Sequence, residues 1–157
     1  MNLEIERKFL VKNNSYKSEA YKKSYIQQGF LNSDKERTVR IRIIDDEAFF
    51  TVKGKSNEKG TTRFEWEKKI SIKEAKSLMK LTEKNTIEKY RYFIKNNAFV
   101  FEVDEFLGDN LGLIVAEIEL TSENDLFNKP DWISEEVTGN TRYYNSSLSK
   151  FPFNLWT

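Results

Sequence analysis

Like charges recur two residues apart along this chain, mostly within segments that alternate polar and apolar residues. Such segments span residues 3–11, 38–44, 48–53, 63–70, 99–106 and 115–120. Successive side chains of a β-strand point to opposite faces, so a period of two predicts strands with one charged and one apolar face. Residues 21–31 and 86–95 are rich in Tyr, Ile and Phe and bring the expected number of strands to eight.

The charged faces of these strands keep one sign. The like-charged pairs are Glu4/Glu6, Arg40/Arg42, Glu65/Glu67, Lys89/Arg91, Glu102/Asp104 and Glu117/Glu119. A solvated sheet face is the simplest interpretation of any single pair. Like charges on neighbouring strands are destabilising, however, so a repeated one-sign pattern needs another cause. We infer that these faces bind external partners, with cations on the carboxylates and an anion on the basic residues.

A closed barrel would give all of the charged faces one common interior. Asp45-Asp46 and Asn96-Asn97 lie between expected strands and predict tight hairpin turns, which make the joined strands antiparallel. Closure also removes the exposed strand edges of an open sheet. The charged faces would then line a polar tunnel.

Flanking helices are expected to cover part of the outside. Ser71 and Glu74 have the spacing of a capping box and are followed by apolar positions on one face, which predicts a helix over residues 71–81 that packs on the sheet. Short helices are also expected at 122–127 and 141–150. Aromatic residues opposite the charged parity, such as Phe64 and Trp66, favour a covered outer face. The expected fold is mainly β with flanking helices (α+β): one domain over residues 1–157, a closed eight-stranded antiparallel β-barrel.

The composition restricts the chemistry. The chain has no Cys and no His, which excludes thiolate nucleophiles, Cys/His zinc sites and a histidine base. Its 26 basic and 25 acidic residues give a formal charge of +1, so neither a nucleic acid nor an acidic membrane is an expected partner. The first residues are charged and no apolar run reaches membrane-spanning length. We therefore expect a cytoplasmic protein.

A charge count over the inward faces indicates the ligand. The carboxylates are Glu4, Glu6, Glu65, Glu67, Glu102, Asp104, Glu117 and Glu119, and the cations are Lys8, Arg40, Arg42, Lys53, Lys89, Arg91 and Arg142. One surplus negative charge remains; two divalent ions would change it to +3, and a polyphosphate of about −4 charge would nearly neutralise the site. Carboxylate clusters suit hard ions such as Mg²⁺, Mn²⁺ or Ca²⁺, and arginine pairs suit phosphate oxygens.

The order of these residues resembles the CYTH family, the triphosphate tunnel metalloenzymes. The segment Glu4-Ile5-Glu6-Arg7-Lys8 is similar to the N-terminal E-x-E-x-K signature, and the later charged pairs follow the family's order. Residues 136–145 are similar to the closing segment of short bacterial members. The resemblance implies an eight-stranded tunnel whose acidic residues bind divalent metal and whose basic residues bind a triphosphate.

By position, the resemblance also implies individual roles. The implied metal ligands are Glu4, Glu6, Asp104, Glu117 and Glu119, with Glu65 and Glu67 assisting through water or by orienting ligands; Glu102 is also included among the metal-binding carboxylates. The implied phosphate-binding residues are Lys8, Arg40, Arg42, Lys53, Lys89, Arg91 and Arg142. The catalytic set is Glu4, Glu6, Lys8, Glu117 and Glu119.

One position departs from the family pattern. Members often have Gln-Gly-Tyr after the second strand, whereas this chain has Gln28-Gly29-Phe30, so a phenol suggested as a proton acceptor is missing. Tyr25 is close in sequence but has the opposite parity. The expected nucleophile is therefore metal-bound water beside a carboxylate.

Three functions remain as hypotheses. The first is hydrolysis of an inorganic or organic triphosphate that depends on one or two Mg²⁺ or Mn²⁺ ions. The second is adenylyl cyclase activity, which some relatives have, and the third is a non-catalytic polyphosphate- or nucleotide-binding module. The partner is a small triphosphate, and the oligomeric state stays open, a homodimer included. Arg63 and the acidic turn at 45–47 are interpreted as solvated charges, and Tyr143 and Tyr144 as packing residues.

Overall fold

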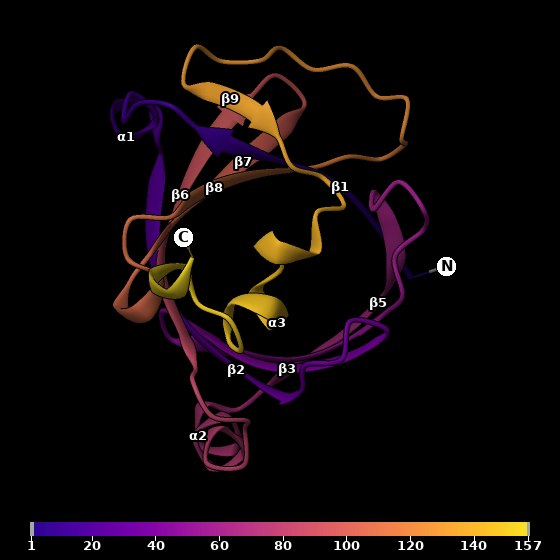
Figure 1. The fold of residues 1–157 in the computed structure, drawn as a ribbon, viewed down its shortest axis with the longest axis vertical. Helices are drawn as coiled ribbons and strands as arrows, with labels where there is room; N and C mark the ends of the chain where they lie inside the picture. Colours follow the sequence, from indigo (N-terminus) through magenta and orange to yellow (C-terminus); the bar gives the residue numbers. More distant parts are fainter. Residues whose placement is uncertain (1, 157) are drawn as a thin grey trace.

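The computed structural model describes residues 2–156, which form mainly β-strands (Figure 1). The strands are β1 (Leu3–Val11), β2 (Lys22–Asn32), β3 (Arg37–Ile44), β4 (Glu47–Gly54), β5 (Thr62–Ile70), β6 (Ile87–Asn96), β7 (Phe99–Phe106), β8 (Ile114–Glu119) and β9 (Ile133–Glu136). The α-helices are α1 (Tyr16–Glu19), α2 (Ile72–Met79) and α3 (Asn145–Leu148). Short 3-10 turns lie at Gly108–Asn110, Thr141–Tyr143 and Phe153–Leu155.

Eight of these strands close into an antiparallel barrel. Hydrogen-bonded neighbours follow the order β5-β4-β3-β2-β6-β7-β8-β1, and β1 pairs back to β5 through Leu3↔Phe64. Figure 1 looks along the resulting ring. The predicted closed barrel is therefore confirmed. A ninth strand, β9, adds to the end of β1, where Val11 pairs with Ile133; its four residues show no alternation, so the period of two does not predict it.

The two predicted hairpin turns both form, one of them shifted by a residue. Ile44 pairs with Glu47, which leaves the dipeptide Asp45-Asp46 as the turn, with Asp45 at a φ of 52°. In the second hairpin Asn96 pairs with Phe99 and belongs to β6, so the turn begins at Asn97, with a φ of 54°. Asp and Asn are enriched at the positive φ that such turns require.

Helix α2 covers the outside of β3 and β4. Its Ala75 is fully buried in a cluster with Ile41 of β3 and Ala48 of β4. The capping box predicted at its start is present: Ser71 Oγ accepts from the Glu74 backbone N–H at 3.0 Å, and Glu74 Oε1 accepts from the Ser71 N–H at 3.4 Å. The helix predicted over 71–81 is thus confirmed with a slightly earlier end.

Ser71→Ala should lower the free energy of unfolding by about 1 kcal/mol, because the substitution leaves an N–H of the first helical turn without its side-chain acceptor. Urea unfolding followed by far-UV circular dichroism measures this loss. Ser77→Ala is the matched control, because Ser77 is an exposed residue of the same helix. An equal loss in both variants would contradict the capping role.

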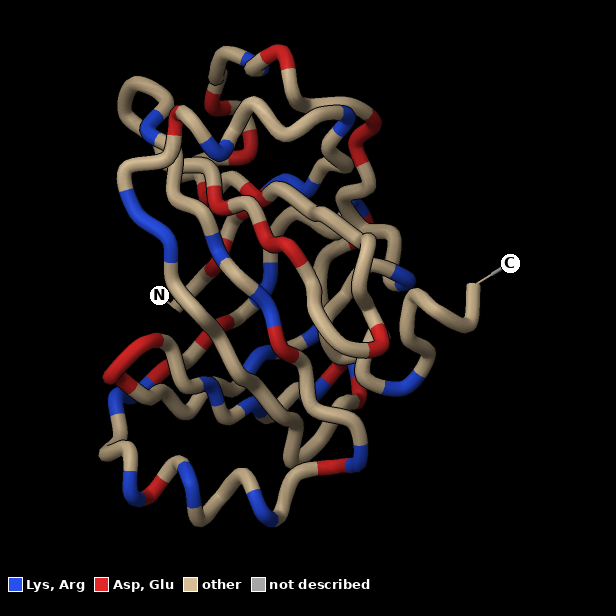
Figure 2. Tube along the Cα trace, turned by 90° about the vertical axis from the view of Figure 1, so that its left-hand side faces the viewer, with Lys and Arg blue, Asp and Glu red and all other residues tan. Residues whose placement is uncertain are grey.

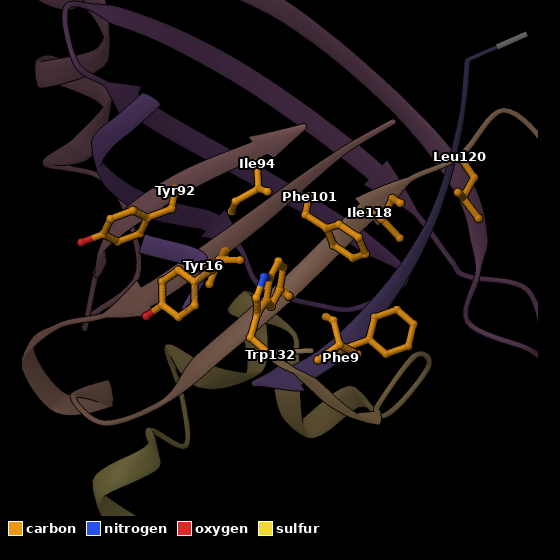
Figure 3. Packing of buried hydrophobic residues seen from close by; sticks show 11 residues of the cluster. Phe9, Tyr16, Tyr92, Ile94, Phe101, Ile118, Leu120 and Trp132 are labelled. Atoms are coloured by element: carbon orange, nitrogen blue, oxygen red, sulfur yellow. The ribbon is translucent and has the colours of Figure 1, made fainter. Parts of the chain in front are cut away.

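A second cluster of buried residues covers the outside of β1, β6, β7 and β8. Figure 3 shows its centre, where the fully buried Trp132 lies between Tyr16 of α1 and Phe101 of β7. The ring centroid of Trp132 lies 5.8 Å from that of Tyr16 and 5.3 Å from that of Phe101, both in edge-to-face contact. The segment before β9 thus covers one side of the barrel as α2 covers another.

The other two predicted helices differ from the structure. Residues 122–127 form a turn instead of a helix, because Asp125 Oδ2 accepts from the backbone N–H groups of Thr121 at 2.7 Å and Ser122 at 2.9 Å. The helix expected over 141–150 is divided into the 3-10 turn at Thr141–Tyr143 and α3. The short helix α1 is not among the predicted helices, although it is preceded by Asn13, Asn14 and the N-cap residue Ser15, which are residue types that favour a helix start.

The aromatic outer face is covered only in part. At the seam between β1 and β5, Leu3, Phe64 and Trp66 are 49%, 45% and 39% exposed, so the covered face expected from Phe64 and Trp66 is wrong there. None of the helices within residues 2–156 has the length and apolar character needed to cross a membrane.

Candidate active site inside the barrel

A cavity of about 380 Å³ lies inside the barrel, and most of the predicted site residues line it. These lining residues are Glu4, Glu6, Lys8, Arg40, Arg42, Lys53, Glu65, Glu67, Lys89, Arg91, Glu102, Glu117 and Glu119. They come from seven strands, and Figure 2 shows how the charged positions spread along the barrel wall. The structure therefore brings together, on the inner face, side chains that lie far apart in the sequence.

Acidic and basic strands lie on different sides of this cavity. Strands β4, β3, β2 and β6 are neighbours in the barrel and carry basic residues that line the cavity. These residues are Lys53 on β4, Arg40 and Arg42 on β3, and Lys89 and Arg91 on β6. The other four strands, β7, β8, β1 and β5, are also contiguous and carry the inward carboxylates, with two cations among them, Lys8 of β1 and Arg63 of β5. The cavity thus has a basic wall and an acidic wall, joined where β4 meets β5 and where β6 meets β7.

Glu4 of β1 contacts cations on β4 and β5, near the first of these seams. Both of its carboxylate oxygens accept from Lys53 Nζ at 3.0 Å, and Arg63 Nε lies 3.6 Å away. Burial alone would raise the pKa of Glu4, but the charge of Lys53, a hydrogen bond with Glu65 and the charge of Arg63 together outweigh burial, and the pKa falls to about 2. Glu4 is therefore ionised at neutral pH without any bound cation.

At three other carboxyls on the acidic wall, nearby cations do not outweigh burial and repulsion. Burial, followed by the charges of Glu117 and Glu4, raises the pKa of Glu6 well above its usual range. Burial and then Glu4 raise the pKa of Glu65 to about 7, although Lys53 Nζ lies 3.4 Å away, and the same two causes raise the pKa of Glu119. Ionisation of these three carboxyls is therefore unfavourable unless a further cation is present.

This wall fits a hard divalent cation by its chemistry. Within residues 2–156 no three acidic side chains form a group that could hold a metal ion as they stand. Every donor on the wall is a carboxylate oxygen, which Mg²⁺, Mn²⁺ and Ca²⁺ prefer. Mg²⁺ usually keeps several waters and uses one or two carboxylates. A cation would also relieve the repulsion that raises the pKa of Glu6.

The basic wall has free hydrogen-bond donors. The buried Nε atoms of Arg40 and Arg42 have no hydrogen-bond partner among the described residues. Burial lowers the pKa of Arg40 to about 10, with the charge of Arg42 as the next cause. Burial, then the charge of Arg91, lowers the pKa of Arg42. Cations crowded with unused donors are the environment that a phosphate group stabilises.

Asp104 lies on β7, opposite Arg91 of the basic strand β6, and does not belong to the cavity lining. It is 2% exposed, and its oxygens accept from Arg91 Nε at 2.8 Å and Arg91 Nη2 at 3.0 Å. Lys89 Nζ also lies 2.8 Å from Asp104 Oδ2. The structure thus places Asp104 as the anion that fixes two basic residues, while its predicted role as a metal ligand stays a prediction.

Arg142 is the other predicted residue that lies apart from the cavity lining. Its guanidinium carbon lies 3.8 Å from the centre of the Trp156 ring, and the residue is exposed. Its predicted role in phosphate binding has no support from this placement.

Five residues interpreted from the sequence as solvated charges or packing residues do line the cavity. Arg63, interpreted as a solvated charge, has a side chain only 15% exposed, and Tyr144 is 8% exposed. The acidic turn residues Asp45, Asp46 and Glu47 also belong to the lining. The alternation along β5 could have predicted that Arg63 points inward, because residue 63 shares a face with residues 65 and 67. The C-terminal segment that carries Tyr144 has no such period.

The missing phenol is not replaced by Tyr25. Phe30 lines the cavity with an apolar ring, whereas the hydroxyl of Tyr25 bonds to Glu88. Neither Tyr25 nor Glu88 belongs to the lining residues. The parity argument that made Tyr25 a poor substitute agrees with this placement.

An eight-stranded antiparallel barrel with acidic and basic walls around an inner cavity defines the class of triphosphate tunnel proteins. The CYTH domain model matches residues 2–152, and the chain belongs to this family. It is 49% identical over 154 residues to an inorganic triphosphatase of Acetivibrio thermocellus, covering 98% of this chain and 97% of that relative. It is 35% identical over 150 residues to an inorganic triphosphatase of Nitrosomonas europaea, covering 93% and 96%.

A solved structure agrees with the fold over almost the same length. The crystal structure of an inorganic triphosphatase superimposes with a TM-score of 0.65 at 32% identity, covering 98% of this chain and 95% of that one. The resemblance drawn from the charged pairs is confirmed.

Proposed function

We propose that this protein is a divalent-metal-dependent triphosphatase that hydrolyses inorganic tripolyphosphate inside the barrel. The observation that carries the proposal is the pair of opposed walls around one cavity of about 380 Å³: the crowded arginines Arg40 and Arg42 lie on one wall, and carboxyls whose pKa is raised, such as Glu6 and Glu65, lie on the other. The names of the two relatives, both inorganic triphosphatases, support the choice of an inorganic substrate.

The basic wall binds and aligns the substrate, together with two cations from the strands of the acidic wall. The proposed binding residues of the basic wall are Arg40, Arg42, Lys53, Lys89 and Arg91, and the two further cations are Lys8 of β1 and Arg63 of β5, which line the same cavity. Guanidinium groups donate paired hydrogen bonds to phosphate oxygens and stabilise the charge that develops on transfer. Asp104 keeps Arg91 and Lys89 oriented toward the cavity through its three contacts.

The acidic wall holds the metal and the proton. The proposed ligands are Glu4, Glu6, Glu117 and Glu119, with Glu65, Glu67 and Glu102 nearby in the lining. Bound Mg²⁺ or Mn²⁺ would supply a Lewis acid for the phosphate oxygens and activate water at neutral pH. Water attacks a terminal phosphorus, the bond to the bridging oxygen breaks, and a wall carboxylate accepts the proton, because Phe30 cannot. The products are orthophosphate and pyrophosphate.

Product analysis tests this proposal against the other two functions. Tripolyphosphate, ATP and thiamine triphosphate are each incubated with the protein in Mg²⁺, in Mn²⁺ and in chelator. We expect orthophosphate and pyrophosphate from tripolyphosphate, only with metal. Cyclic AMP and pyrophosphate from ATP would overturn the proposal in favour of a cyclase. Tight binding of tripolyphosphate without turnover in either metal would leave a binding module.

A further inference from the structure

The segment that follows β9 contributes to the cavity as well as to the outside. Tyr144, Asn145 and Ser146, at the start of α3, belong to the cavity lining. In Figure 1 this segment lies across the opening of the ring. Two of its side chains contact cations of the cavity.

The ring of Tyr144 lies close to two cations. Lys8 Nζ is 5.1 Å from the ring centroid and Arg63 Cζ is 5.3 Å from it. Cations within about 6 Å of an aromatic face are attracted by it, more strongly when partly desolvated. The Tyr144 hydroxyl lies 3.2 Å from Ser56 Oγ, which fixes the far end of the ring. The ring therefore holds two mutually repelling cations at defined positions.

Asn145 holds a third cation. Its Oδ1 accepts from Lys89 Nζ at 2.8 Å and from Gln28 Nε2 at 2.6 Å. Because Lys89 Nζ also contacts Asp104 at 2.8 Å, two of its three protons have fixed acceptors and one remains for a ligand. Gln28 is fully buried, and its donation to Asn145 Oδ1 favours the orientation of the Asn145 amide in which this oxygen, and not the NH₂ group, faces Lys89.

The backbone that carries these side chains is fixed by a close crossing of two glycines. A Cβ on Gly60 would lie 2.1 Å from Gly139 Cα, and a Cβ on Gly139 would lie 2.8 Å from the Lys59 carbonyl oxygen. Both glycines have positive φ, at 75° and 79°. Just before the crossing, the Val137 N–H donates to the Lys8 carbonyl at 2.8 Å. The segment is thus attached to the strand that carries Lys8.

We propose that Tyr144 and Asn145 are positioning residues that orient Lys8, Arg63 and Lys89 for phosphate binding. This inference rests on the proposed triphosphatase function. The inference adds one requirement to that function. The C-terminal segment, which carries none of the alternating charges, is needed to complete the basic part of the site. Without these contacts the three cations repel one another and their geometry is no longer set before the substrate binds.

The test compares Tyr144→Leu with Tyr144→Phe. Loss of the aromatic face should raise KM for tripolyphosphate about tenfold and change kcat less, because two cation–π contacts are lost. The phenylalanine variant keeps the face and should restore KM to within about twofold of wild type. Tyr143→Leu is the matched control, because the Tyr143 ring packs on Trp156, with centroids 5.3 Å apart, and Tyr143 is not a lining residue. It should leave KM unchanged.

Several results would overturn the inference. A folded Tyr144→Leu protein with wild-type KM would do so, and so would a phenylalanine variant as impaired as the leucine variant. If Tyr144→Leu does not fold, Asn145→Leu decides, with a raised KM expected and an unchanged KM contradictory. A wild-type protein that fails to hydrolyse tripolyphosphate contradicts the proposed function itself, and that outcome is visible before any variant is compared.

Discussion

Glu6→Gln is expected to reduce metal-dependent hydrolysis of tripolyphosphate at least about a hundredfold while the barrel stays folded. Replacing a partner that merely orients a metal ligand already costs about 10–100-fold, so loss of a proposed direct ligand should cost more. Glu6 lies opposite Glu119 across β1 and β8, and the charges of Glu117 and Glu4 act on it. The measurement is kcat/KM over a titration with Mg²⁺ and, separately, Mn²⁺.

The same variant should not be destabilised in the absence of metal. Burial and the charges of Glu117 and Glu4 raise the pKa of Glu6 well above its usual value. A carboxyl whose pKa is higher in the folded than in the unfolded state reduces stability as the pH rises from the unfolded value, about 4.3, through the folded one. Glutamine cannot ionise, so Glu6→Gln should be at least as stable as wild type at neutral pH. The difference should shrink in acid, and thermal unfolding in chelator at both pH values measures it.

Glu6 is a cleaner choice than its neighbours on the acidic wall. Glu4→Gln would deprive Lys53 of a partner at 3.0 Å, and Glu117→Gln would remove the partner of Lys8 at 3.5 Å. Either change would disturb the proposed phosphate-binding residues as well as the metal. Glu88→Gln is the matched control, because Glu88 bonds to Tyr25 and is not a lining residue. Wild-type metal dependence in Glu6→Gln would contradict the assignment of Glu6 as a ligand.

Strand parity explains why so much of the cavity could be predicted. In a closed barrel each strand has one inner face, so a single binary choice of face places Glu4, Arg40 and Glu117 together without knowledge of their distances. The like-charged pairs indicated which face of each strand is the inner one. The exposed Phe64 and Trp66 could not be predicted in the same way, because parity gives the outer face but not the elements that cover it.

The rest of the site depends on geometry outside the alternating strands. Asp104 has the parity of an inward residue, but it is buried in contact with Arg91 and Lys89 and does not line the cavity. Tyr144 and Asn145 reach the cavity through a segment whose course is set by the crossing of Gly60 and Gly139. Contacts between residues about 80 positions apart leave no periodic signal in the sequence.

Trp132→Ala should lower the free energy of unfolding by about 3–5 kcal/mol, the range for truncating a large buried aromatic residue. Trp132 is fully buried against Tyr16 and Phe101, and its carbonyl accepts from the Lys12 N–H at 2.9 Å just before β9 begins. The cavity left behind would loosen the outer cover of β1, which is the strand that carries Glu4, Glu6 and Lys8. Urea unfolding followed by far-UV circular dichroism measures the loss.

The indole nitrogen of Trp132 makes Trp132→Phe an informative control. Among the described residues Nε1 has no hydrogen-bond partner, so the buried N–H costs free energy that phenylalanine does not incur. Phenylalanine also keeps an aromatic ring between Tyr16 and Phe101, so its loss should be clearly smaller than that of alanine. Equal losses in the two variants would contradict the packing role of the aromatic ring. A negligible loss in Trp132→Ala would mean that the cover formed before β9 is dispensable for the barrel. The strand that carries Glu4 and Glu6 would then be held by its ladders with β8 and β5 alone.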